Sequence, residues 1–147
     1  MLTGTAAESE RVARLSAAIA YPTVNLAGRT TLWTLGALIE SASHLVCNDT
    51  GVSHVAAALG TPSVVVSCGG DALRWAPLDG TRHTVLWHPV PCRPCAHAVC
   101  PIGHDCARAI GVDEVVGLLD AQAARRPVEE PVTWQRGART QPRHEPA

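Results

Sequence analysis

Apolar and polar residues alternate along the chain with the periods of helices and short strands. Residues 5–20 carry apolar side chains at the spacing of one helical face, and Thr5 and Glu8 have the spacing of a capping box. Strands that alternate with helices favour right-handed βαβ units and an α/β, Rossmann-like parallel sheet with flanking helices. Further helices are predicted for residues 31–42, 52–59 and 112–124, and strands for residues 24–26, 44–47, 63–67 and 83–87.

The two ends of the chain differ from the middle. Only Met1, Leu2 and Thr3 precede the first helix as a possible strand, so the sheet is expected to be N-terminally truncated. The segment after Arg125 is rich in Pro, Arg, Gln and Glu and has few core residues, which predicts a disordered tail at 126–147. The sequence therefore predicts one partial domain at residues 1–125.

Composition narrows the possible functions. All 12 basic residues are arginine, so the chain has no lysine for a P-loop or for Schiff-base catalysis. The formal net charge of -1 provides no field that would attract nucleic acid or an anionic membrane. No apolar stretch is long enough to span a membrane, and the N-terminus has no signal-like run. We therefore expect a cytoplasmic protein with no transmembrane segment and no nucleic-acid partner.

Four of the six cysteines lie in one loop, residues 91–106. A Cys-x2-Cys pair is a common part of a structural zinc site, but the other two cysteines do not repeat this spacing. A reduced loop and a labile disulfide are the alternatives, and we predict no metal ligands. The cysteines of the loop are Cys92, Cys95, Cys100 and Cys106, with His97 and His104 between them.

The turn between residues 44–47 and 52–59 carries the most informative chemistry. Ligands of parallel α/β sheets bind at the carboxyl ends of strands, and a helix N-terminus offers N–H groups to a phosphate. Gly51 permits close approach, Thr50 and His54 can donate hydrogen bonds, and Asp49 can accept them from sugar hydroxyls. The plainer alternative is that Asp49 and Thr50 are helix caps and His54 is a buried, hydrogen-bonded histidine.

The motifs around this turn resemble those of glycosyltransferase family 9, the ADP-heptose:lipopolysaccharide heptosyltransferases. The family signature Asp-Thr/Ser-Gly-x-x-His is present at residues 49–54, followed by an Ala-rich helix and Gly-Thr-Pro at 60–62. Residues 71–77 resemble the family's Asp-x-x-Arg-Trp-x-Pro segment, and residues 92–95 and 100–104 resemble its cysteine segments. The motifs occur in the same order as in the family.

The resemblance implies the C-terminal half of a GT-B fold, in which two Rossmann-like domains face each other across a cleft. That half binds a nucleotide-diphosphate sugar such as ADP-heptose, without a cofactor, for transfer into lipopolysaccharide or cell-surface glycan. The implied donor-binding residues are Asp49 at the sugar hydroxyls, Thr50, Gly51 and His54 at the diphosphate, Glu8 at the ribose and Thr30 near the base. Glu8 is equally explained by its capping box alone, and Arg74 is either a phosphate partner or a solvated arginine.

The resemblance does not cover the acceptor-binding domain, where the family keeps its general base. The family also has a basic residue, commonly lysine, ahead of the matched segment, where it neutralises donor phosphates. We therefore expect no catalytic residue in this chain, which would need an acceptor-binding domain or chain as a partner. The alternative function is a non-catalytic metal-binding or interaction module built on the cysteine loop. A dinucleotide-dependent dehydrogenase is disfavoured because no G-x-G-x-x-G follows a strand.

Overall fold

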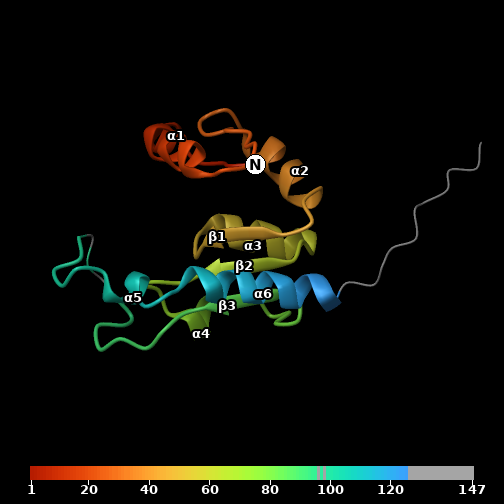
Figure 1. Cartoon of the computed structure of the whole chain (residues 1–147). Helices are drawn as coiled ribbons and strands as arrows, with labels where there is room; N and C mark the ends of the chain where they lie inside the picture. The colour runs from red at the N-terminus through yellow and green to blue at the C-terminus, as the bar shows by residue number, and fades with distance from the viewer. Residues whose placement is uncertain (96, 98, 126–147) are drawn as a thin grey trace, which may run out of the picture.

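A three-stranded parallel sheet forms the centre of the computed structural model, which describes residues 1–95, 97 and 99–125 (Figure 1). The strands β1 (Leu45–Asn48), β2 (Ser63–Val66) and β3 (His83–Leu86) lie in the order β1-β2-β3, and each is parallel to its neighbour. This arrangement confirms the predicted α/β, Rossmann-like sheet. The predicted disordered tail at 126–147 lies outside the described residues.

The central strand β2 supplies the core of the sheet. Val64 and Val65 are 0% and 1% exposed, which agrees with the continuous apolar run of this segment. On one side β2 pairs with β1, with Val64 opposite Val46, and on the other side it pairs with β3. Because all three strands run the same way, the residues that follow them meet at one edge of the sheet.

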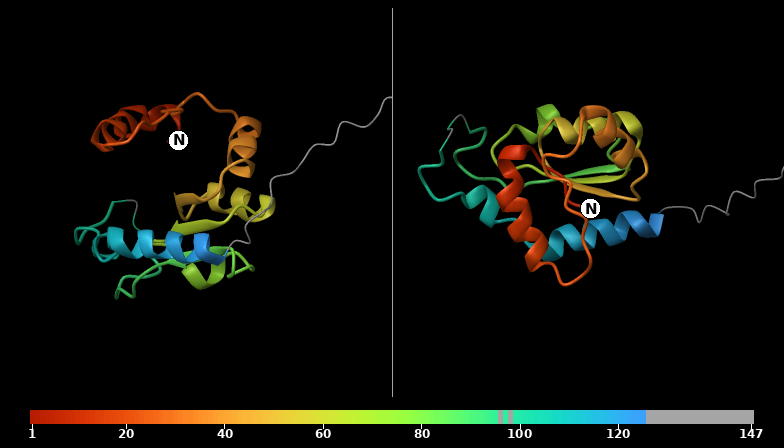
Figure 2. Two further views of the ribbon diagram at one scale, coloured as in Figure 1. Left: turned by 45° about the vertical axis from the view of Figure 1, so that its right-hand side comes forward. Right: turned by 90° about the horizontal axis from the view of Figure 1, so that it is seen from above.

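Helices cover both faces of this sheet. The helix α3 (Gly51–Leu59) packs against β1 and β2, and α6 (Val112–Arg125) packs against β2. Seen from above, the sheet lies between these two helices (Figure 2). On α6 the buried side chain is Gln122, whose Nε2 donates to the Ser63 and Arg82 carbonyl oxygens and to Thr84 Oγ1 at 3.0 to 3.2 Å. The apolar pattern of the helix did not predict this polar anchor.

The N-terminal segment lies apart from the three-stranded sheet, above β1 in Figure 1. It consists of η1 (Ala6–Glu8) and α1 (Ser9–Ala18), and it connects to β1 through α2 (Leu32–Glu40). The predicted strand at 24–26 is reduced to an isolated parallel bridge between Leu2 and Asn25. The predicted helix at 5–20 is correspondingly shorter, and only the first residue of its apolar face, Val12, is buried.

Two short helices, of four residues each, lie in segments for which no helix was predicted. In α4 (Ala72–Trp75), the Asp71 carboxylate accepts hydrogen bonds from the backbone N–H groups of Leu73 and Arg74 at 3.1 and 3.2 Å. This side-chain cap stabilises a turn too short to show a helical period. The second is α5 (Asp105–Arg108), inside the cysteine loop. Among the helices of the described residues, none has both the length and the apolar character needed to cross a membrane.

Candidate functional site

The residues after the three strands gather at the carboxyl edge of the sheet. Asp49 follows β1, Ser67 follows β2 and Trp87 follows β3. The strand pairing continues into this edge, because the Asp49 N–H donates to the Val66 carbonyl oxygen at 3.1 Å and the Ser67 N–H donates to the Leu86 carbonyl oxygen at 3.0 Å. The backbone therefore places Asp49 beside the loop that begins at Ser67.

The first turn of α3 is free of side-chain caps. Thr50 occupies the N-cap position with an extended backbone, at φ -144° and ψ -179°, and its side chain accepts no hydrogen bond from the helix. Its hydroxyl lies 3.5 Å from the Asn48 carbonyl oxygen, which is long for a hydrogen bond. The cap alternative for Asp49 and Thr50 is therefore wrong. The Ser53 N–H donates to the Thr50 carbonyl oxygen at 3.0 Å, so the Gly51 and Val52 N–H groups, with the positive end of the helix dipole, remain available to a ligand.

Open space adjoins this helix start. A Cβ placed on Gly51 would have no heavy atom within 4 Å, and Thr50 and Gly51 are both exposed. His54, one turn further along α3, is exposed as well, so it is not the buried histidine of the plainer alternative. The three predicted diphosphate-binding residues thus lie together on an exposed part of α3.

Trp75 of α4 lies against His54. The indole of Trp75 meets the imidazole of His54 in an edge-on arrangement, with ring centroids 6.3 Å apart. The Arg74 guanidinium lies over the Trp75 ring, 5.2 Å from its centroid. Arg74 is therefore held near the predicted diphosphate site by an aromatic contact, which the sequence motif alone could not indicate.

Asp49 is held by a neighbouring strand end. Its Oδ2 atom accepts a hydrogen bond from Ser67 Oγ at 2.9 Å, and Oδ1 has no hydrogen bond to any described residue. On the strand that Asp49 follows, burial and, to a smaller extent, the charge of Asp49 raise the pKa of the Cys47 thiol to about 11. Cys47 is therefore protonated at neutral pH, and Asp49 presents one bound and one free carboxylate oxygen.

Glu8 and Thr30 lie in the N-terminal segment. Glu8 Oε2 accepts hydrogen bonds from the Thr5 N–H at 2.8 Å and from Thr5 Oγ1 at 2.7 Å. These bonds hold the pKa of the Glu8 carboxyl below its ordinary value, and the bond from the Thr5 backbone N–H contributes most. The predicted pairing of Thr5 with Glu8 is thus present. Thr30 is half-buried, and no hydrogen bond among the described residues joins either side chain to the turn at 49–54.

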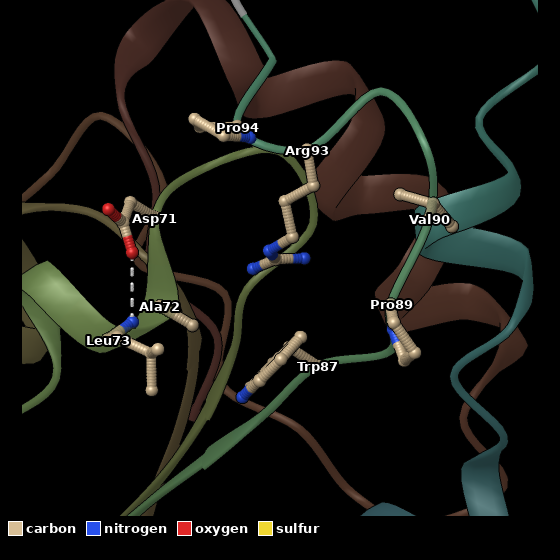
Figure 3. A pocket seen from close by; sticks show the side chains of 8 residues that line it. All are labelled: Asp71, Ala72, Leu73, Trp87, Pro89, Val90, Arg93 and Pro94. Carbon is tan, nitrogen blue, oxygen red and sulfur yellow. Dashed lines mark hydrogen bonds between the residues drawn. The ribbon is translucent and has the colours of Figure 1, made fainter.

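A cavity of about 270 Å³ opens beside the same sheet edge, between α4 and the loop after β3 (Figure 3). The residues of the turn at 49–54 do not line it. Its wall includes Trp87 and Arg93, and the Arg93 guanidinium lies over the indole, 5.0 Å from its centroid. Sequence reasoning missed Arg93 because its position in the cysteine loop carries no periodic signal. Ser67 could have been found as the residue that follows a buried strand.

The cysteine loop holds free thiols throughout its described part. Within residues 1–95, 97 and 99–125, no group of three or more His, Cys, Asp or Glu side chains lies in a position to hold a metal ion. The alternative of a metal-binding module therefore gains no support from this arrangement. One thiol is distinct: the N–H groups of Ile102, His104 and Gly103 lower the pKa of Cys100.

Comparison with known proteins agrees with this geometry. The sequence model of glycosyltransferase family 9 (heptosyltransferase) matches residues 1–105. The chain is similar to the lipopolysaccharide core heptosyltransferase OpsX of Haemophilus influenzae, with 32% identity over 78 residues, which are 53% of this chain and 22% of that protein. The matched part thus spans about a fifth of that relative, and no solved structure matches the chain. Since the family match includes all three strands and the turn at the start of α3, the chain belongs to glycosyltransferase family 9.

Proposed function

We propose that this chain binds the donor of a heptosyltransferase-like reaction, a nucleotide-diphosphate sugar such as ADP-heptose. The observation that carries the proposal is the uncapped start of α3, which presents backbone N–H groups next to open space. A diphosphate suits such a helix end because the N–H groups and the helix dipole stabilise negative charge. Thr50 and His54 add side-chain donors on the same exposed turn.

The sugar would lie against Asp49. An ionised carboxylate only accepts hydrogen bonds, and its free Oδ1 suits the hydroxyls of a sugar better than the oxygens of a phosphate. Glu8 and Thr30 remain the proposed contacts for the ribose and the base, by family resemblance. Arg74 is an additional candidate for the diphosphate because its contact with Trp75 holds it near His54.

The proposed reaction is an inverting displacement at the anomeric carbon of the sugar. The acceptor hydroxyl must lose a proton to a base, while the leaving diphosphate gains negative charge that needs stabilisation. The start of α3 would supply the second requirement. We assign the base to an acceptor-binding domain or partner chain, so that this chain alone binds the donor without transferring it. Lipopolysaccharide or another cell-surface glycan as the acceptor, and a cytoplasmic location, belong to the same proposal.

Isothermal titration calorimetry with ADP and ADP-heptose tests this proposal. The chain should bind both ligands. His54→Ala should weaken binding of ADP and of ADP-heptose, whereas Asp49→Ala should weaken binding of ADP-heptose only. Arg14→Lys on the exposed surface of α1 is a matched control that should bind as the parent chain does. Unchanged affinities in both site variants would place the ligand elsewhere and contradict the proposal.

A further inference from the structure

A chain of hydrogen bonds runs from the cysteine loop to Asp49. Arg93 Nη2 donates to Ser67 Oγ at 2.8 Å, and Ser67 Oγ donates to Asp49 Oδ2 at 2.9 Å. The chemistry of the groups fixes the direction of both bonds. A guanidinium has no acceptor and an ionised carboxylate has no donor, so the hydroxyl proton of Ser67 must point at Asp49.

Arg93 is itself held in place on several sides. Its guanidinium also donates to the carbonyl oxygens of Ser67, at 3.0 and 3.1 Å, and Cys68, at 2.7 Å. One face of the group lies over the Trp87 ring. Arginine can make these bonds at once because its planar guanidinium carries several N–H donors in fixed directions, which the ammonium group of lysine does not. The side chain therefore has little freedom to leave Ser67.

The backbone around this arginine docks on the loop that follows β2. The Cys95 N–H donates to the Gly69 carbonyl oxygen at 2.8 Å. At the next position, a Cβ on Gly70 would lie 2.9 Å from Asp49 Oδ2, closer than real Cβ contacts. Asp49 Oδ2 thus lies close to both the Ser67 hydroxyl and the Gly70 backbone. Only its Oδ1 remains without a bond to the described residues.

We propose that Arg93, acting through Ser67, is a positioning residue that sets the orientation of the Asp49 carboxylate for the donor sugar. The proposal rests on the proposed function, in which Asp49 contacts sugar hydroxyls and α3 contacts the diphosphate. The segment from Cys92 to Cys95, which carries Arg93, would then contribute to recognition of the sugar and would not be a separate module. Loss of this support should weaken binding of the sugar and leave binding of the nucleotide unchanged.

Two variants of the full chain separate positioning from folding. Ser67→Ala removes only the linking hydroxyl and keeps the bonds from Arg93 to the backbone carbonyls. Arg93→Lys keeps the positive charge and removes the planar guanidinium with its several N–H donors. Ser63→Ala is the matched control, because Ser63 is equally buried at the opposite end of β2 and bonds to His83. Arg14→Lys is the control for the arginine substitution.

Calorimetry measures the ratio of the ADP and ADP-heptose dissociation constants for each variant. Both site variants should reduce the preference for the sugar nucleotide about tenfold, the effect of one lost hydrogen bond to a charged group, while ADP affinity stays constant. Ser67→Ala added to Asp49→Ala should cause no further change. An unchanged ratio, or an equal loss of ADP affinity, would show a purely structural role and overturn the proposal.

Nuclear magnetic resonance of the labelled chain gives a readout that requires no ligand. Three-bond couplings to the Asp49 carboxyl carbon should report one χ1 rotamer in the parent chain and in both controls. They should report averaged rotamers in Ser67→Ala and Arg93→Lys. If the parent chain binds neither ADP nor ADP-heptose, the proposed function fails and these couplings still decide the positioning role. A single unchanged rotamer in both variants would refute it.

Discussion

Gly51→Ala separates the stability of α3 from ligand binding. Gly51 is the first residue of the helix, its φ does not lie in the left-handed region, and the added methyl group would meet no atom within 4 Å. Alanine also restricts the unfolded chain more than glycine does. We therefore expect the free energy of unfolding to rise by about 0.4–1 kcal/mol.

The same methyl group would enter the space proposed for the donor diphosphate. It would push a phosphate away from the N–H groups of the first helical turn, at the cost of at least one charge-assisted hydrogen bond. Such a bond contributes about 1.5–3 kcal/mol, so ADP affinity should fall roughly 10- to 100-fold. Greater stability combined with weaker binding is the expected signature of this variant.

The assay combines urea denaturation with calorimetric titration of ADP. Gly117→Ala in α6 is the control, because its methyl group also meets no atom within 4 Å but lies on a helix that carries no proposed site residue. This control should gain stability, about 1 kcal/mol for a helix interior, without a change in affinity. If Gly51→Ala binds ADP as tightly as the parent chain, the diphosphate does not lie at the start of α3 and the reasoning fails.

Three further predictions concern other parts of the molecule. Gln122→Ala removes an amide whose two N–H donors are shared among three acceptors at the amino ends of β2 and β3, and chemical denaturation should show a loss of about 2 kcal/mol. Burial lowers the pKa of His83 below its ordinary 6.5, so the folded state binds fewer protons than the unfolded state. The contribution of His83 to the free energy of unfolding should be fully present above pH 6.5 and be lost as the pH falls below 6.5. If a His83→Asn variant lost stability with falling pH as steeply as the parent chain does, this prediction would be wrong. Cys100, whose pKa is lowered, should react with iodoacetamide at pH 7 faster than Cys47, whose pKa is about 11; mass spectrometry of the modified peptides gives the order.

Much of the sheet was predictable from local pattern. The segments around β1, β2 and β3 are short apolar runs between helices. β2 and β3 lie within their predicted ranges, and β1 is displaced by one residue, to Leu45–Asn48 from the predicted 44–47. The apolar pattern did not predict α4, because that short helix is stabilised by the polar side chain of Asp71 at its start. The isolated bridge between Leu2 and Asn25 is a different case, since a strand needs a neighbour to exist and local composition does not supply one.

Of the candidate site, too, the sequence predicts one part and the structure decides the other. Asp49, Thr50, Gly51 and His54 are close in sequence, so a strand, a turn and a helix suffice to bring them together. The sequence could not decide whether Asp49 and Thr50 cap the helix, because a cap and a ligand-binding turn use the same residue types. The structure decides against the cap, since the Asp49 carboxylate turns to Ser67 instead.

The sequence by itself determined the alternation of elements, the family motifs and the turn at the end of β1, because these depend on residues near one another in the chain. Only the tertiary structure brought Arg93 and Ser67 to Asp49, and Trp75 to His54. Ser67 is 18 positions from Asp49 and Arg93 is 26 positions from Ser67, and the contact of Trp75 with His54 joins α4 to α3. Parallel strands place the residues that follow them at one edge, and no local pattern encodes which side chains meet there.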